Sequence, residues 1–214
     1  MVVKNLILIR HGQGHHNALF AANRFEEGRA LRDPVLTDLG IKQCSDLNDS
    51  LSLLFNSSEK GQKLKIDVVI SSPMKRALET TNHVFKGMDV PVVVSPLPTE
   101  MSNKPSNYGV NPSELVPLFP HYDFSLVTND WWPVDETDEQ MMSRAEKCKE
   151  FLVSRPEENI AVVAHGLFLG ALTNIPKALN RFKNCDLRSY QLDSETLQMT
   201  QSAWSVLTGN ESIN

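Results

Sequence analysis

Two short apolar segments of the chain end in the same way, at a histidine followed by a glycine. Leu6–Ile9 runs into Arg10-His11-Gly12, and Asn159–Ala164 runs into His165-Gly166. Neither run alternates with polar residues, which is typical of strands that are covered on both faces in a parallel sheet. Because such sheets bind ligands beyond the carboxyl ends of their strands, the pattern predicts two buried strands that deliver these motifs to one edge.

Helical periodicity predicts three longer helices. Thr37 is the expected N-cap of the first, which runs to about Phe55 and turns one apolar face inward. The residues of that face are Ile41, Cys44, Leu47, Leu51 and Leu54. The serines of Ser71-Ser72-Pro73 are expected to cap a second helix that begins at Pro73 and carries Arg76 in its first turn. A capping box at 137–140 predicts the third helix, which ends near Ser154.

Further strands are expected between and after these helices. Apolar runs predict strands at 66–70 and 90–95, and Pro91 places the second of them near a sheet edge. Alternating residues at 187–200 predict a C-terminal hairpin. This order of elements predicts one α/β domain over residues 1–214, a three-layer α/β/α sandwich with a mostly parallel central sheet, whose last dozen residues form a loose tail.

Two segments lack a clear period. Residues 24–34 mix charges with glycine and proline and are predicted to form a loop, after a helical start within 12–23. Residues 96–133 contain seven prolines and are predicted to be irregular, apart from a short helix near 113–118. Long irregular segments in compact domains usually serve as lids or substrate loops, so both segments are candidates for contact with a substrate.

Composition excludes several classes of protein. Hydrophobic residues make up 41% and charged residues 22% of the chain, which are ordinary globular values. A net charge of −5 argues against general binding to nucleic acid or to an anionic membrane. The short apolar N-terminus does not resemble a signal peptide, and no apolar run is long enough to span a bilayer.

The three cysteines, Cys44, Cys148 and Cys185, are scattered and show no C-x-x-C spacing. This usage predicts a reducing compartment, the cytoplasm by default, rather than a disulfide framework or a thiolate metal site.

The motifs together resemble a known family. In chain order they are Arg10-His11-Gly12 with Asn17, Leu36-Thr37-x-x-Gly40, Ser71-Ser72-Pro73-x-x-Arg76-Ala77, Glu100 and Ala164-His165-Gly166. Over most of the chain this series resembles the histidine phosphatase superfamily, also called phosphoglycerate mutase-like. Trp131-Trp132-Pro133 and the segment 120–125 are similar to small phosphatase-like members of plants, fungi and protists.

The resemblance implies that His11 is the nucleophile that becomes phosphorylated. The residues it implies for holding the phosphoryl oxygens are Arg10, Asn17, Arg76, His165 and Gly166. The chemistry favours these residue types, because hydrolysis of a phosphate monoester needs about 20 kcal/mol or more of barrier reduction. An imidazole splits the reaction into two displacements, and fixed cationic donors stabilise the charge on the equatorial oxygens.

The proton donor to the leaving oxygen is implied to be Glu100. Glu114 lies in the same irregular segment and is the alternative acid. A third interpretation is that Glu100 is an ordinary loop carboxylate.

No metal or cofactor is expected, because the arginines and histidines already supply the positive charge that a metal provides elsewhere. His15 and His16 lie beside His11 in sequence, but adjacent histidines on a helix point about 100° apart and no acidic ligand accompanies them. The residues in the irregular segments that are candidates for contact with the rest of the substrate are Arg24, Arg29, Arg32, Lys104 and Tyr108. Solvated loop charges are the expectation for most of these.

Two departures from the family's mutases favour hydrolysis. The mutases usually carry Glu after Arg-His-Gly and a Gly-Trp segment further on, whereas this chain has Gln13 and Glu27-Gly28-Arg29. The expected activity is therefore hydrolysis of a small phosphorylated metabolite. The alternatives are a 2,3-bisphosphoglycerate-dependent phosphoglycerate mutase and a catalytically weak phosphate-binding or scaffolding protein.

Overall fold

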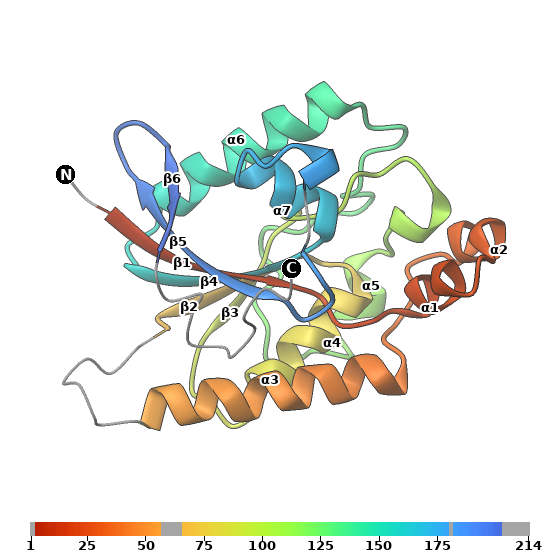
Figure 1. Ribbon diagram of the computed structural model, residues 1–214, viewed down its shortest axis with the longest axis horizontal. Helices are drawn as coiled ribbons and strands as arrows, with labels where there is room; N and C mark the ends of the chain where they lie inside the picture. Colours follow the sequence, from red (N-terminus) through yellow and green to blue (C-terminus); the bar gives the residue numbers. More distant parts are fainter. Residues whose placement is uncertain (1–2, 57–65, 180–181, 203–214) are drawn as a thin grey trace.

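The computed structural model describes residues 3–56, 66–179 and 182–202. Its elements in chain order (Figure 1) are β1 (Val3–Arg10), α1 (His15–Ala21), α2 (Phe25–Ala30), α3 (Asp38–Asn56), β2 (Val68–Ser71), α4 (Lys75–Val84), β3 (Val92–Val94), the 3-10 helix η1 (Pro105–Asn107), α5 (Pro112–Leu115), α6 (Asp138–Ser154), β4 (Asn159–Ala164), α7 (Gly166–Leu172), the 3-10 helix η2 (Lys177–Leu179), β5 (Leu187–Asp193) and β6 (Met199–Gln201). The predicted tail lies outside the described residues.

A six-stranded sheet in the order β3-β2-β4-β1-β5-β6 forms the middle layer. The first four strands are parallel to one another, whereas β5 and β6 are antiparallel. Helices α3 and α4 cover one face and α6 and α7 cover the other (Figure 1). The predicted α/β/α sandwich is confirmed, as are the edge position of β3 and the C-terminal hairpin.

The two central strands, β1 and β4, are buried on both faces. Leu6 and Leu8 pack in the core beneath α6 and α7, whereas Ile7 and Ile9 pack in the core against α3 and α4. Burial of each such side chain contributes about 1.5–3 kcal/mol to the stability of the fold. A strand between two helical layers therefore carries apolar residues on both faces instead of alternating with polar ones. This explains the unbroken apolar runs before the two histidines.

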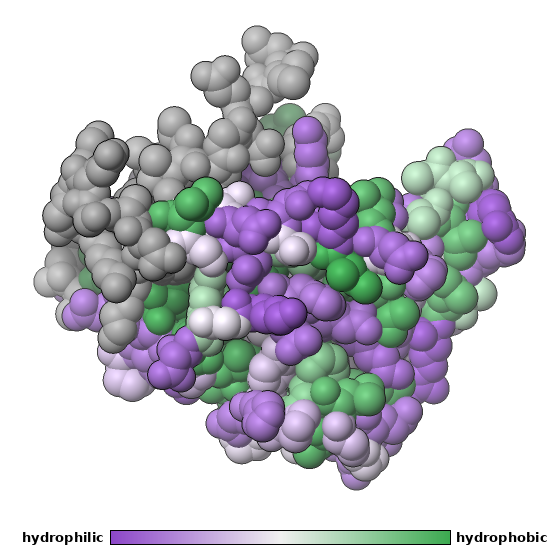
Figure 2. All heavy atoms as spheres, turned by 90° about the horizontal axis from the view of Figure 1, so that it is seen from below, coloured by the Kyte–Doolittle hydropathy of each residue, from purple (hydrophilic) through white to green (hydrophobic). Residues whose placement is uncertain are grey.

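Helix α3 begins as predicted. The Gly40 amide donates to Thr37 Oγ1 at 3.1 Å, which confirms Thr37 as the N-cap. Cys44, Leu47 and Leu51 face the core, but Ile41 is 39% exposed and lies at the margin of the apolar face. The α3 side of the molecule (Figure 2) mixes hydrophilic and hydrophobic side chains. The side chain of Leu54 lies outside the described part of the chain.

Helix α4 begins two residues later than predicted. Its first residue is Lys75 and its N-cap is Met74, so the expected start at Pro73 is wrong. Ser72 is therefore not the N-cap; its hydroxyl accepts from the Met74 amide at 3.4 Å and lies 2.8 Å from Nε2 of His165. Arg76 still lies in the first turn.

The segment predicted as a loop at 24–34 contains α2. Ion pairs of Arg24 with Glu27 and of Arg29 with Glu26 support this short helix. Gly28 lies inside this helix, where its lack of a side chain allows α2 to pack closely against α1. A Cβ at position 28 would lie 2.6 Å from the Phe20 ring. The glycine therefore serves helix packing.

The segment at 96–133 is irregular, as predicted, except for η1 and α5. The expected helix near 113–118 is the four-residue α5, which ends at Leu115. Residues of this segment form a third apolar cluster with α4. Thr137 and Gln140 form the predicted capping box of α6. Among the described residues, no helix is both long enough and apolar enough to cross a membrane.

Candidate active site

Strands β1 and β4 bring the two histidines side by side. Arg10 is paired with Ala164, and the His11 amide donates to the Ala164 carbonyl at 3.0 Å. The His11 and His165 ring centroids are 5.1 Å apart. The sheet register therefore sets the distance between the two imidazoles.

His11 is 2% exposed and its ring is held at both nitrogens. Nδ1 lies 2.6 Å from the Gly12 carbonyl oxygen, so we assign the ring proton to Nδ1. Nε2 then carries the lone pair, and Arg76 Nε donates to it at 3.3 Å. Burial, followed by the charge of Arg76, lowers the pKa of His11 well below 6.5. The site therefore holds a neutral imidazole whose Nε2 faces a guanidinium.

Arg76 is fixed in the site by residues of η1. It is 1% exposed, and it donates to the Ser106 carbonyl at 3.0 Å and to Asn107 Oδ1 at 3.1 Å. Burial lowers the pKa of Arg76 to about 10, so the side chain remains a cation at neutral pH. The first turn of α4 and η1 together aim this cation at His11.

Arg10 is a second cation at the same edge. Its Nη1 donates to the Phe182 carbonyl at 2.6 Å, whereas its buried Nε has no partner among the described residues. Burial lowers the pKa of Arg10, and the charge of Glu100 opposes this shift. A Cβ at position 166 would lie 3.4 Å from Arg10 Nε, so Gly166 lies directly against the guanidinium.

His165 and Asn17 complete the set of residues assigned to the phosphoryl group. His165 is fully buried; burial, followed by the charge of Arg76, lowers its pKa well below 6.5. Asn17 Oδ1 accepts from the Gly14 amide at 3.0 Å and from Asn184 Nδ2 at 3.3 Å. These bonds occupy its carbonyl oxygen and leave its NH2 group as the part that can donate to a ligand.

Glu100 reaches this site from the loop after β3. Its carboxylate accepts from the amides of Leu167 at 3.2 Å and Phe168 at 3.1 Å, in the first turn of α7. Electrostatic interactions connect Glu100 with both Arg10 and Arg76. Glu114, the alternative acid, is exposed on α5. The geometry therefore favours Glu100.

A buried ion pair that the sequence analysis missed holds the Glu100 loop. Arg144 donates to both carboxylate oxygens of Glu136, at 2.8 and 2.6 Å, and to the carbonyls of Leu97 and Thr99, both at 2.7 Å. Glu136 accepts in turn from the Ser102 amide at 3.2 Å. The pair thus forms hydrogen bonds with the loop backbone on both sides of Glu100.

The sequence analysis weighed His16 only as a metal ligand and did not identify Asn184, yet both lie beside His11. His16 is 5% exposed, its ring centroid lies 5.7 Å from that of His11, and burial lowers its pKa to about 2. Asn184 donates to the carbonyls of His11 at 3.0 Å and Gly12 at 3.2 Å. His16 and Ser72 lie within the motif segments and were accessible to inspection, whereas nothing around Asn184 signals its role.

Unpartnered buried polar atoms gather around His11. In the described part of the chain they include Arg10 Nε, His16 Nδ1, Ser106 Oγ and His165 Nδ1. A buried donor without a partner costs about 1–3 kcal/mol, and an anion with several acceptor oxygens relieves several such costs at once. The donor set therefore suits a phosphoryl group.

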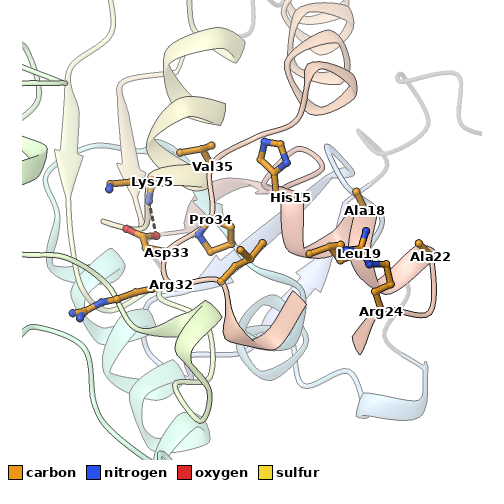
Figure 3. A pocket seen from close by; sticks show the side chains of 11 residues that line it. His15, Ala18, Leu19, Ala22, Arg24, Arg32, Asp33, Pro34, Val35 and Lys75 are labelled. Atoms are coloured by element: carbon orange, nitrogen blue, oxygen red, sulfur yellow. Dashed lines mark hydrogen bonds between the residues drawn. The ribbon is translucent and has the colours of Figure 1, made fainter. Parts of the chain in front are cut away.

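Among the described residues, no group of three His, Cys, Asp or Glu side chains is placed to hold a metal ion. His15, considered above as a possible ligand, instead lines a surface pocket of ≈ 580 Å³ (Figure 3). Ala18, Leu19 and Ala22 of the same α1 face line it too, whereas His16 points to His11. His11, His16 and His165 are thus not among the residues that line this pocket.

The loop residues considered for substrate contact divide into two groups. Arg24 and Arg29 form the exposed ion pairs of α2, Arg32 donates to the Gly109 carbonyl, and Tyr108 donates to Asp135. Lys104 alone among the five interacts electrostatically with both Glu100 and Arg76. Lys104 is thus the loop cation that lies beside the site.

Comparisons with known proteins agree with this geometry. The model of the histidine phosphatase superfamily (branch 1) matches residues 6–211. Phosphoglycerate mutase-like protein 1 of Arabidopsis thaliana is 34% identical, over 87% of this chain and 80% of its own. A protein of Schizosaccharomyces pombe named as a probable phosphatase is 30% identical, over 81% of this chain and 79% of its own.

Solved structures share the fold at low sequence identity. A mycobacterial glucosyl-3-phosphoglycerate phosphatase superposes with a TM-score of 0.58 at 18% identity, over 95% of this chain and 99% of that one. The phosphoserine phosphatase of Entamoeba histolytica gives 0.57 at 18% identity, over 94% and 95%.

Proposed function

Because the chain belongs to the histidine phosphatase superfamily, we propose that it hydrolyses small phosphomonoesters through a phosphohistidine on His11, without a metal. The observation that carries this proposal is the neutral His11 ring, whose Nε2 faces Arg76 among buried donors that lack partners. The phosphatase named among its relatives supports hydrolysis.

In the first step, Nε2 of His11 attacks phosphorus and the bond from phosphorus to the ester oxygen breaks. Glu100 gives its proton to the departing oxygen, so the alcohol leaves neutral and the phosphoryl group stays on His11. Arg10, Arg76 and Asn17 hold the equatorial oxygens. The dianionic phosphate adds negative charge beside His165, which favours the protonated form of that imidazole.

In the second step, water attacks the phosphohistidine and Glu100 takes its proton. The bond from phosphorus to Nε2 breaks, and its electron pair returns to the imidazole. Inorganic phosphate leaves, and the enzyme regains neutral His11 and protonated Glu100. The Nδ1 bond to the Gly12 carbonyl holds the ring in one tautomer throughout both steps.

Mutase chemistry is the second candidate, because three relatives carry the name phosphoglycerate mutase-like protein. Gln13 argues for hydrolysis at the position where the mutases have Glu. Its side-chain oxygen accepts from the Thr37 hydroxyl at 2.8 Å, so it braces the start of α3 instead of carrying a charge toward the substrate.

The test is turnover of p-nitrophenyl phosphate with and without EDTA, in parallel with phosphoglycerate isomerisation. We expect hydrolysis that EDTA leaves unchanged, and isomerisation below hydrolysis. Loss of turnover on chelation, restored by one divalent ion, would refute the metal-free mechanism. Binding of phosphate without turnover of any ester in a panel of phosphorylated metabolites would instead identify a binding protein.

A further inference from the structure

Two cysteines that are far apart in sequence meet beneath the catalytic histidine. Cys44 lies on α3 and Cys185 lies just before β5, 141 residues away, yet their sulfur atoms are 3.4 Å apart. Both are free thiols. The third cysteine, Cys148, packs in the other core, beneath α6. Cys44 and Cys185 are thus distant in sequence but adjacent in the fold.

Direct contacts connect the pair with the nucleophile. The Cys185 amide donates to the carbonyls of Arg10 at 3.1 Å and His11 at 3.2 Å. On the other side, Gly12 lies against Cys44, because a Cβ at position 12 would lie 2.9 Å from its sulfur. The pair thus flanks the peptide units that hold His11.

The two sulfurs suit the two roles of disulfide formation. Cys185 is half-buried and within reach of a small oxidant, whereas Cys44 is fully buried. Hydrogen bonds from Cys185, the Thr80 hydroxyl and the Gly12 amide lower the pKa of Cys44 against the effect of burial, whereas the hydrogen bond to Cys44 and burial raise the pKa of Cys185. Cys185 is therefore the proton donor of the pair and Cys44 the acceptor. Cys185 has a φ of 56°, which is uncommon for a residue other than glycine and persists only where the surroundings enforce it.

We propose that Cys44 and Cys185 are a modification site at which a hydroperoxide forms a reversible disulfide that lowers phosphatase activity. The Cys185 sulfur attacks the outer peroxide oxygen while its proton passes through Cys44 to the departing oxygen. The O–O bond breaks, which gives a sulfenic acid on Cys185, releases water or alcohol, and leaves Cys44 as the thiolate. The Cys44 thiolate then attacks the Cys185 sulfur, the S–O bond breaks, and water leaves. Two thiols and one hydroperoxide thus give one disulfide, and a dithiol reverses the reaction.

The disulfide alters the site through the backbone. Its S–S bond is about 2.05 Å long, so the two sulfurs must move roughly 1.3 Å closer than in the thiol form. Because the Cys185 amide donates to the Arg10 and His11 carbonyls, we expect part of this movement to reach His11, and a misplacement of about 1 Å can reduce turnover by about a hundredfold. The disulfide closes a long loop and so restricts the unfolded chain, which stabilises the folded state. Oxidation therefore lowers activity and raises thermal stability together.

The experiment treats the full chain with hydrogen peroxide and then with dithiothreitol. We expect peptide mapping to join the Cys44 and Cys185 peptides, turnover of p-nitrophenyl phosphate to fall at least tenfold, the melting temperature to rise, and dithiothreitol to reverse all three. Cys185→Ala and Cys44→Ala should lose all three responses. Cys148→Ala, which leaves the pair intact, should keep them.

The activity readout rests on the proposed function, whereas the disulfide and the melting temperature do not. An active enzyme that forms no Cys44–Cys185 disulfide, or forms it without losing activity, would overturn the proposal. Inactivation of Cys185→Ala to the same extent as the wild type would also overturn it, because damage elsewhere would then explain the loss. If the reduced protein hydrolyses no ester while the disulfide forms and raises the melting temperature, the proposed function fails and regulation of phosphatase activity fails with it, but the modification site stands.

Discussion

The active site has two halves that are positioned by different physical means. His11 and His165 follow two hydrogen-bonded parallel strands, so the backbone ladder of β1 and β4 sets their separation. Glu100 lies in a loop with no ladder, and the buried ion pair of Arg144 and Glu136 holds that loop by side-chain contacts. The position of His11, the proposed nucleophile, thus follows from sheet register, whereas the position of Glu100, the proposed acid, follows from long-range side-chain packing.

This difference predicts different failures. A substitution in the strand half removes a reacting group or a donor and leaves the backbone in place. A substitution in the loop half displaces the acid and leaves the phosphoryl centre intact. The step of the reaction that a variant impairs should therefore show which half of the site the substitution affects.

The largest expected effect is that of His11→Ala. The variant lacks the nucleophile, and water replaces it only with poor orientation, so turnover should fall by several orders of magnitude. The measurement is rapid quench with phosphorus-labelled substrate at alkaline pH, where we expect phosphohistidine to persist. Label should appear on His11 of the wild type and be absent from the variant.

His165→Ala is the matched control within the strand half. It removes one donor and keeps the nucleophile, so the rate should fall by roughly 10²- to 10³-fold while label still accumulates slowly on His11. Label on His165 of the wild-type enzyme, or on no histidine at all, would mean that these roles are wrongly assigned.

The loop half is tested by Arg144→Lys, which keeps the charge but loses the forked hydrogen bonds to Glu136, Leu97 and Thr99. An alkyl phosphate needs a proton on its leaving oxygen, so kcat for this ester should fall about 10- to 100-fold, within the usual contribution of a general acid. A nitrophenolate leaves without that proton, so kcat for p-nitrophenyl phosphate should fall only a few fold.

Glu100→Gln is the reference for that experiment, because it removes the acid itself. The two variants should show the same dependence on leaving group, and the loss should be smaller in Arg144→Lys. An equal loss for both esters in Arg144→Lys, or a loss confined to KM, would show that Arg144 acts on overall stability or on binding rather than on the position of Glu100.

The same division explains what could be predicted from the sequence. Apolar runs, caps and strand ends are local signals, and they predicted the two central strands, the N-cap at Thr37 and the first-turn position of Arg76 correctly. The Arg144–Glu136 pair and the Asn184 contacts join residues that no periodicity relates. Such pairings exist only once the chain has folded.

The wrong boundaries have equally specific causes. Gly28 looked like a helix breaker, but close packing against Phe20 and two ion pairs outweigh its low helix propensity. Ser72 looked like a helix cap, but its hydroxyl lies within hydrogen-bond distance of His165. In both places a tertiary contact overrides a local preference.

The smallest expected effect on activity comes from pH. Burial lowers the pKa values of His11 and His165 well below 6.5 in the folded protein, so neither ring should titrate at the ordinary pKa of histidine. The pH profile of kcat/KM should therefore show no transition from these rings near pH 6.5, and the loss due to a protonated nucleophile should begin only at lower pH. A pH profile of kcat/KM measures this directly, and a fall that follows a single pKa near 6.5 would contradict it.

The stability of the fold, unlike the activity, should depend on pH in this range, because these histidines have their ordinary pKa in the unfolded chain. Below pH 6.5 these histidines bind protons in the unfolded state but not in the folded state. The free energy of unfolding therefore decreases as the pH is lowered, by roughly 1 kcal/mol per histidine per pH unit. His16, whose pKa is about 2, adds to the same trend. Urea unfolding at pH 7 and pH 5 measures the loss, and replacing His16 with Gln should reduce its slope while leaving the contribution of His11 and His165. Because the buried histidines beside Arg10 and Arg76 stay neutral in the folded protein, acidification should reduce the stability of the enzyme before it reduces the activity.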